Sequence, residues 1–160
     1  MIVKNRSNIS SWQCYHNALG NTKGIQIQST NAAVTSSTYW NNTSPTNLLF
    51  TVGTSSNTNT SGDKYVAYLF ASCPGVSKVG SYTGTGATQT ISCGFTGGAR
   101  FVLIKRTDST GDWYVWDTAR GMVAGTDPYL LLDSTAAEVN ANNVYTTSVG
   151  FQIVGTGSGI

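Results

Sequence analysis

The stretch FVLIKRTDSTGDWYVWDTARG, residues 101–121, sets two apolar segments on either side of a short polar turn. Residues 1–20, MIVKNRSNISSWQCYHNALG, repeat this pattern without a gap at an offset of 101 residues. The offset aligns residues of the same or similar type: Lys4 with Lys105, Trp12 with Trp113, Tyr15 with Trp116, Ala18 with Ala119 and Gly20 with Gly121. The chain therefore carries one predicted structural unit twice, as internal repeats do.

The alignment extends into the later part of both units. After a shift of three further residues, STNAA at 29–33 meets DSTAA at 133–137. Further along, the first offset returns and pairs two apolar positions: Phe50 with Phe151 and Val52 with Ile153. The predicted repeat thus spans most of each unit.

Apolar segments of strand length recur in both units, and turns rich in Ser, Thr, Asn and Gly separate them. The segment GIQIQS at 24–29 alternates apolar and polar residues, as a half-buried antiparallel strand does. The predicted fold class is all-β: antiparallel β-sandwich units, with two similar repeats in tandem. The predicted strands lie at 2–3, 12–15, 24–28, 48–52 and 65–71 in the first unit and at 88–93, 101–105, 113–117, 129–132 and 151–154 in the second.

We expect a first unit at 1–72, a junction at 73–79 and a second unit at 80–160, because proline and several glycines follow Cys73. The first unit lacks a counterpart of the second unit's initial strands, and the second lacks a counterpart of the first unit's final strand. The expectation is a segment of a longer repeat array, with strands supplied by a neighbour as the alternative. One segment, 134–143, has the capping-box spacing of Thr135 and Glu138 and predicts at most a turn of helix.

Charged residues make up 10% of the chain, against roughly 25% in average soluble proteins. A net charge of +2 is too small to indicate binding to nucleic acid or a membrane surface. No signal peptide or membrane-spanning stretch is predicted, so we expect a soluble chain assembled in a reducing cytoplasm. Residues 1–62 contain three cations and no acid, whereas acidic residues crowd the second half. Complementary charge between units or subunits and chance are both open explanations.

The three cysteines, Cys14, Cys73 and Cys93, lack the spacing of metal ligands. Cys14 aligns with Val115, and Cys93 ends an alternating run, so both are predicted to be small buried apolar residues. A Cys14–Cys93 disulfide is the alternative.

The ionisable residues predict scaffold roles. His16, the single histidine, aligns with Asp117, so a catalytic step common to both units is not expected. The segment DSTGD at 108–112 predicts a hairpin turn, with a calcium loop as the alternative. Asp117 and Arg120 predict a turn-stabilising ion pair before Gly121. We predict no catalytic residues, no metal site and no cofactor.

The loop TYWNNTSPTN at 38–47 is the candidate binding surface. It combines two aromatic rings with amide neighbours, the groups that contact the apolar faces and hydroxyls of a sugar. The candidate glycan contacts are Tyr39, Trp40, Asn41 and Asn42. The alternative is that Trp40 closes the open end of a sandwich.

The run SYTGTGATQTISCGF at 81–95, followed by ARFVLIKRTDSTGDWYVWDTARG at 99–121, resembles repeats in virion proteins of tailed bacteriophages, especially phages of marine bacteria. Two departures are HNALG at 16–20, in place of the family's acidic turn, and GGAR at 97–100, in place of its Pro-Asp. The elements that carry the resemblance are Tyr82–Gly86, Gln89–Ile91, Gly94–Phe95, Phe101–Lys105, Asp117–Gly121, Ser134–Ala137, Gly150–Ile153 and Asn59–Tyr68.

The resemblance implies a β-rich structural repeat of a tail fibre or another virion appendage, without catalysis. Expected partners are other virion proteins, copies of the same chain in a homo-oligomer, and host-surface polysaccharide in host attachment or receptor binding; nucleic acid and membrane insertion are not expected. The expected location is the virion. Two alternatives stay open: a capsid-surface decoration protein, and a glycan depolymerase with an inter-subunit site. The acids available to such an enzyme are Asp108, Asp112 and Asp127.

Overall fold

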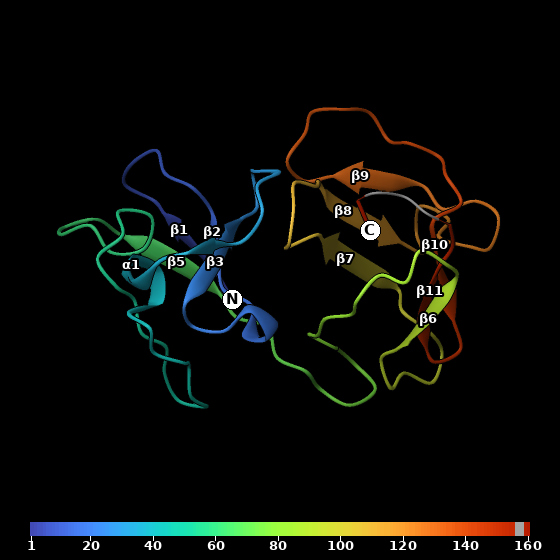
Figure 1. Cartoon of the computed structure of the whole chain (residues 1–160), viewed down its shortest axis with the longest axis horizontal. Coiled ribbons are helices and arrows are strands. Elements are labelled where there is room, and N and C mark those ends of the chain that lie inside the picture. The colour runs from blue at the N-terminus through green and yellow to red at the C-terminus, as the bar shows by residue number, and fades with distance from the viewer. Residues whose placement is uncertain (156–158) are drawn as a thin grey trace. The chain divides into compact units, whose positions relative to one another are not determined.

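The computed structural model describes residues 1–155 and 159–160 and is almost entirely β (Figure 1). Its contacts divide the chain into two compact units. The first unit comprises Met1–Phe70 with Thr107–Ser109, and the second comprises Ala71–Arg106 with Thr110–Ile160. All strand pairs in both units are antiparallel, which confirms the all-β fold class.

The first unit is built on one five-stranded sheet with the order β4-β3-β2-β1-β5. Strands β1 to β4 follow one another along the sheet, and β5 returns to the free edge of β1. This return pairs Asn5 with Tyr65 and Ile2 with Tyr68. The strands are β1 (Ile2–Asn5), β2 (Gln13–Cys14), β3 (Lys23–Gln26), β4 (Val34–Thr35) and β5 (Tyr65–Tyr68).

A single helical turn, α1 (Ser37–Trp40), contributes to the core on one face of this sheet. The Ser36 hydroxyl caps the turn by accepting a hydrogen bond from the Thr38 amide at 3.2 Å. Trp40 is 0% exposed, and its indole N–H donates to the Lys23 carbonyl at 3.0 Å. Its ring meets Tyr15 edge-on at 5.7 Å between centroids. Trp40 therefore ties the loop after β4 to strand β3 and to the core.

The long loop between α1 and β5 is held by neutral side chains. Asn59 donates its amide hydrogen to the Gly53 carbonyl at 2.8 Å. The Tyr65 hydroxyl donates to the Ser56 carbonyl at 2.9 Å and accepts from the Thr60 amide at 2.8 Å. Because these side chains replace secondary structure as partners of the loop backbone, the loop keeps one conformation without strands of its own.

The second unit contains two three-stranded sheets, with the orders β10-β11-β6 and β7-β8-β9 (Figure 1). One core of apolar residues draws on both sheets, including Val102 and Trp116 from one and Val144 and Phe151 from the other. Two sheets sharing a core make this unit sandwich-like. The strands are β6 (Gln89–Ser92), β7 (Phe101–Lys105), β8 (Trp113–Asp117), β9 (Tyr129–Leu131), β10 (Val144–Thr147) and β11 (Gly150–Ile153).

The two units share a three-stranded meander, β1-β2-β3 in the first and β7-β8-β9 in the second. Residues aligned by the sequence offset lie buried at the same places: Val3 corresponds to Ile104, and Tyr15 corresponds to Trp116. The units differ in what covers this meander, because the second unit adds a separate sheet and the first adds α1 and its flanking loops.

The turns that end β2 and β8 are also alike. The His16 imidazole accepts from the Ala18 amide at 3.2 Å, and the Asp117 carboxylate accepts from the Arg120 amide at 2.9 Å. Arg120 also donates its Nε–H to Asp117 at 2.7 Å, which confirms the predicted ion pair. Both turns finish on a glycine with positive φ, Gly20 at 77° and Gly121 at 105°.

One sequence-based prediction of local structure, the strand at 48–52, is wrong, whereas segment 134–143 agrees with the expectation of at most a turn of helix. Residues 48–52 form no strand, although Phe50 and Val52 pack against the core. Residues 134–143 form no helix, because Val139 pairs with Tyr129 through two backbone hydrogen bonds and Glu138 lies near Arg120 instead of capping. Helical turns lie instead at α1 and at a 3-10 turn, η1 (Asn17–Leu19), and neither was predicted.

The cysteines are free, so the alternative of a Cys14–Cys93 disulfide is wrong. Cys14 is buried, and burial raises the pKa of its thiol to about 11. Cys93 is half-buried and its pKa is also raised by burial, whereas Cys73 is exposed. Cys14 and Cys93 thus behave as small apolar residues.

We predict that Trp40→Ala destabilises the first unit by about 3–5 kcal/mol, because it removes the ring that fills the core and leaves a cavity. Urea unfolding followed by circular dichroism measures the change. Leu48→Ala, at a side chain 88% exposed, is the control and should stay within about 0.5 kcal/mol of the parent chain. Equal stability of the two variants would show that the core does not depend on Trp40.

A second prediction concerns Asp63, which accepts hydrogen bonds from the side chains of Asn5 at 2.6 Å and Asn8 at 2.9 Å. The Asn5 bond, followed by the Asn8 bond, lowers the pKa of Asp63 below its ordinary value of 3.8. The stabilisation is therefore present above pH 3.8 and is lost as the pH falls through the lower folded value. Asp63→Asn should be less stable than the parent at neutral pH, and the difference should shrink in acid. A difference independent of pH would contradict this assignment.

Candidate functional site

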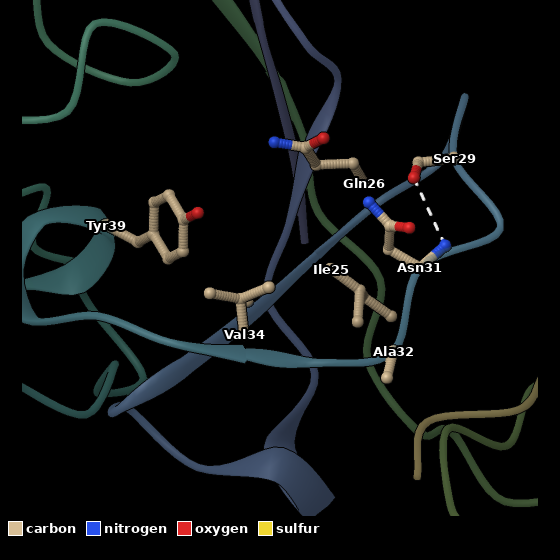
Figure 2. A pocket seen from close by; sticks show the side chains of 8 residues that line it. Ile25, Gln26, Ser29, Asn31, Ala32, Val34 and Tyr39 are labelled. Atoms are coloured by element: carbon tan, nitrogen blue, oxygen red, sulfur yellow. Dashed lines mark hydrogen bonds between the residues drawn. The ribbon is translucent and has the colours of Figure 1, made fainter. Parts of the chain in front are cut away.

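A small pocket of about 120 Å³ lies in the first unit, beside strand β3 (Figure 2). Its walls come from β3, from the loop that follows it, from β4 and from the Tyr39 ring of α1. The lining residues are Gly24, Ile25, Gln26, Ser29, Asn31, Ala32, Val34 and Tyr39. We call this the Tyr39 pocket.

The Tyr39 ring lies against β3 because Gly24 has no side chain. A Cβ atom at this position would lie 2.8 Å from Cδ2 of Tyr39 and would also collide with the Gln13 side chain. On the opposite wall, the backbone N–H of Asn31 donates to the Ser29 hydroxyl at 3.2 Å, a bond drawn in Figure 2. Glycine in the strand and this local turn thus set the width of the pocket.

The pocket presents one aromatic ring, aliphatic groups and uncharged polar side chains. Figure 2 shows Ser29 and Asn31 at one end and Tyr39 at the other, with the Gln26 amide between them. Amides and hydroxyls both donate and accept hydrogen bonds, and a ring face packs against apolar C–H groups. A small uncharged polyhydroxyl group, such as one sugar residue, fits this chemistry.

The structure divides the four predicted glycan contacts. Tyr39 is half-buried and lines the pocket. Trp40 lies in the core with no exposed surface, so its ring cannot meet a sugar, and its inclusion is corrected; the alternative, that this ring closes the unit, describes its place. Asn41 and Asn42 are exposed, with positive φ angles of 51° and 50°, and are not among the residues that line the pocket.

Sequence reasoning missed the amide residues opposite Tyr39. Gln26 lies in the alternating segment that predicted a strand, and alternation shows only that its side chain leaves the strand on the side opposite Ile25. Asn31 lies in the aligned STNAA segment, where the local signal is a turn. No sequence pattern brings these residues to Tyr39; the pairing of β3 with β4 does.

The three acids available to an enzyme, Asp108, Asp112 and Asp127, have different surroundings. Asp127 is 0% exposed, and its carboxylate accepts from the backbone amides of Asn143 at 2.8 Å and Val144 at 2.6 Å. Asp112 accepts a long hydrogen bond of 3.4 Å from the Tyr114 hydroxyl, whose pKa is raised by burial and then by Asp112. Asp108 is exposed in the β7–β8 hairpin, which is the turn predicted there. Asp127 thus fixes the start of β10.

Other ionisable groups also serve turns. The pKa of Asp117 is lowered, first by the backbone N–H of Arg120 and then by that residue's side chain. The pKa of His16 is lowered by burial, as is that of the amino group of Met1, which donates to the Tyr15 carbonyl at 2.8 Å. Within residues 1–155 and 159–160, no group of three or more His, Cys, Asp or Glu side chains could hold a metal ion.

The fold and the pocket define a β-rich domain with a neutral, amide-lined cavity. The chain belongs to the family DUF7483, a domain of unknown function, which matches residues 1–159. No curated protein and no solved structure matches the chain. The described part of the chain has no helix long and apolar enough to span a bilayer.

We predict that Asp127→Ala destabilises the second unit by about 2–4 kcal/mol, because the backbone amides of half-buried Asn143 and buried Val144 lose their acceptor. Chemical denaturation measures the loss. Glu138→Ala is the matched control, since Glu138 is exposed and makes one long ion pair of 3.6 Å with Arg120. Its effect should stay below about 0.5 kcal/mol. If Asp127→Ala were as stable as the parent chain, the structural role of the Asp127 carboxylate would be contradicted.

Proposed function

We propose that this chain is a non-catalytic structural module of a bacteriophage virion appendage, such as a tail fibre, and that it also contacts glycans of the host surface. It would pack against other virion proteins and against copies of itself. The resemblance of both units to virion repeats supports this location. Low charge and neutral polar surfaces suit a part that is packed into a larger assembly.

The observation that carries the structural role is the use of the ionisable side chains. Asp127 holds the start of β10, and Asp117 and His16 hold equivalent turns. Asp63 ties the end of β1 at Asn5 to Asn8 in the loop that follows. A general acid or base must instead reach a proton of the substrate. Ionisable groups whose hydrogen bonds lie within their own unit serve the scaffold.

The Tyr39 pocket supports the glycan contact. Its ring and the amides opposite supply the two kinds of interaction that sugar recognition uses, without a charge that would need a counter-ion. Because the pocket is small, it suits one sugar unit of a longer chain and weak contacts that gain strength through many copies in an assembly.

Cryo-electron microscopy of intact particles tests the proposed location. Side-chain density for this chain in a tail, fibre or baseplate is the expected result. Density on the capsid shell would overturn the appendage and leave a decoration protein. Absence from washed particles would overturn both virion assignments.

The non-catalytic part is tested by incubating the purified chain with host polysaccharides. We expect their viscosity to stay constant over hours. A steady fall in viscosity that survives Asp127→Asn, Asp112→Asn and Asp108→Asn, tested singly, would point to another catalyst, and a fall that one of them abolishes would identify a depolymerase. Either fall would overturn a purely structural role.

A further inference from the structure

The first unit's sheet has a second face, opposite the core that contains Val3 and Trp40. Side chains alternate between faces along a strand, so Ile2 and Lys4 lie on the face opposite Val3. Register then places Tyr68, the partner of Ile2, on this same face. Continuing the β1–β2 pairing by one residue sets Trp12 opposite Lys4.

Two aromatic rings lie together on this face. Trp12 and Tyr68 stack with their centroids 6.3 Å apart and an interplanar angle of 26°. Trp12 is 36% exposed and Tyr68 is 47% exposed. Both backbone polar groups of Trp12 are hydrogen-bonded. Its N–H donates to the Gln28 side chain at 3.0 Å, and its carbonyl accepts from the Ile27 backbone N–H at 3.2 Å. The pair forms an exposed aromatic platform on regular strands.

Positive charge accompanies the platform. The Lys4 ammonium lies 6.0 Å from the centroid of the Trp12 ring and donates to the Asn5 carbonyl at 2.8 Å. Past the end of β1, Arg6 donates its amide to the Lys64 carbonyl at 2.7 Å, which continues the register and sets two more cations on the same side by alternation.

The first unit carries four Lys and Arg side chains against two acids, Asp63 and Asp108. Residues 1–62 contain no Asp or Glu. The next residue, Asp63, already accepts hydrogen bonds from the side chains of Asn5 and Asn8. A ligand with carboxylates therefore finds cations beside flat apolar rings, whereas a neutral ligand would use the rings alone.

The second unit does not repeat this surface. Trp113, which aligns with Trp12, is 5% exposed. Lys105, which aligns with Lys4, donates to the Gly111 carbonyl at 2.6 Å within its own hairpin, and the charges of Asp133 and Asp112 act on it. The exposed ring pair with cations belongs to the first unit, although the underlying meander occurs in both.

We propose that the Trp12–Tyr68 platform binds an anionic polysaccharide, with uronic-acid rings stacked on the two aromatic side chains and their carboxylates paired with Lys4, Arg6 and Lys64. This inference deepens the glycan contact of the proposed function and rests on it, but assigns that contact to a site separate from the Tyr39 pocket. Chain polymers suit the platform, because it lies open on a sheet face and does not enclose its ligand.

Affinity electrophoresis of the purified full chain tests the site with three polymers. Alginate offers sugar rings and carboxylates, dextran offers rings without charge, and poly-glutamate offers carboxylates without rings. We expect the strongest retardation by alginate and a decline of this retardation as salt rises. Equal binding to dextran would overturn the role of charge, and equal binding to poly-glutamate would overturn the role of the rings.

Variants locate the binding. Trp12→Ala and Tyr68→Ala should each weaken alginate binding about tenfold, and Lys4→Gln should remove part of its salt dependence. Phe101→Ala, at an aromatic side chain 60% exposed in the second unit, is the matched control and should bind as the parent does. Circular dichroism of each variant checks that the sheet remains folded.

The remaining outcomes separate this inference from the proposed function. Loss of alginate binding in Tyr39→Ala with full binding in Trp12→Ala would overturn the platform and keep glycan contact at the pocket. No binding to any polysaccharide would overturn both glycan assignments. The structural role would be unaffected, because cryo-electron microscopy of the particle tests it separately. Tighter binding to single-stranded DNA than to alginate would overturn the saccharide as the ligand.

Discussion

The burial of Trp40 is the constraint on which the first unit depends. A single sheet has one apolar face to cover, and in the second unit a separate sheet covers the equivalent meander. The first unit has no such sheet among its described strands, and one indole ring with a short helical turn takes this place. If the offset that aligns 29–33 with 133–137 is continued, Trp40 meets Val144, which is also 0% exposed at the start of β10. A large side chain at one aligned position thus performs the packing that a strand performs at the other.

The second common theme is the use of side chains as backbone partners. Strands are short, and long segments lie outside them, so their peptide groups need other hydrogen-bond partners. Asn59 and Tyr65 supply these in the first unit, and Asp127 supplies them in the second. A chain with so few charges achieves this mainly with amides and hydroxyls, which cost less to bury than ions do.

Local patterns predicted the meanders well. The hairpin around 108–112 and the Asp117–Arg120 turn follow from alternation and turn chemistry, both of which act over a few residues. Residues 48–52 have the apolar pattern of a strand but do not pair with another strand. A local pattern cannot show whether a pairing partner exists. The capping-box spacing at 134–143 produces no helix, because Val139 in this segment pairs with Tyr129. The candidate site was predicted least well. Tyr39 and Trp40 are neighbours in sequence, but their side chains leave the helical turn in different directions, Tyr39 toward the pocket and Trp40 into the core.

The effect of a substitution in strand β1 is expected to alternate from one residue to the next, because successive side chains lie on opposite faces of the sheet. Val3 and Asn5 are buried, whereas Ile2 and Lys4 belong to the opposite face. Substitutions at odd positions therefore act on folding, and those at even positions act on what the surface presents. Selection can therefore alter the even positions and change this surface while the odd positions keep the fold stable.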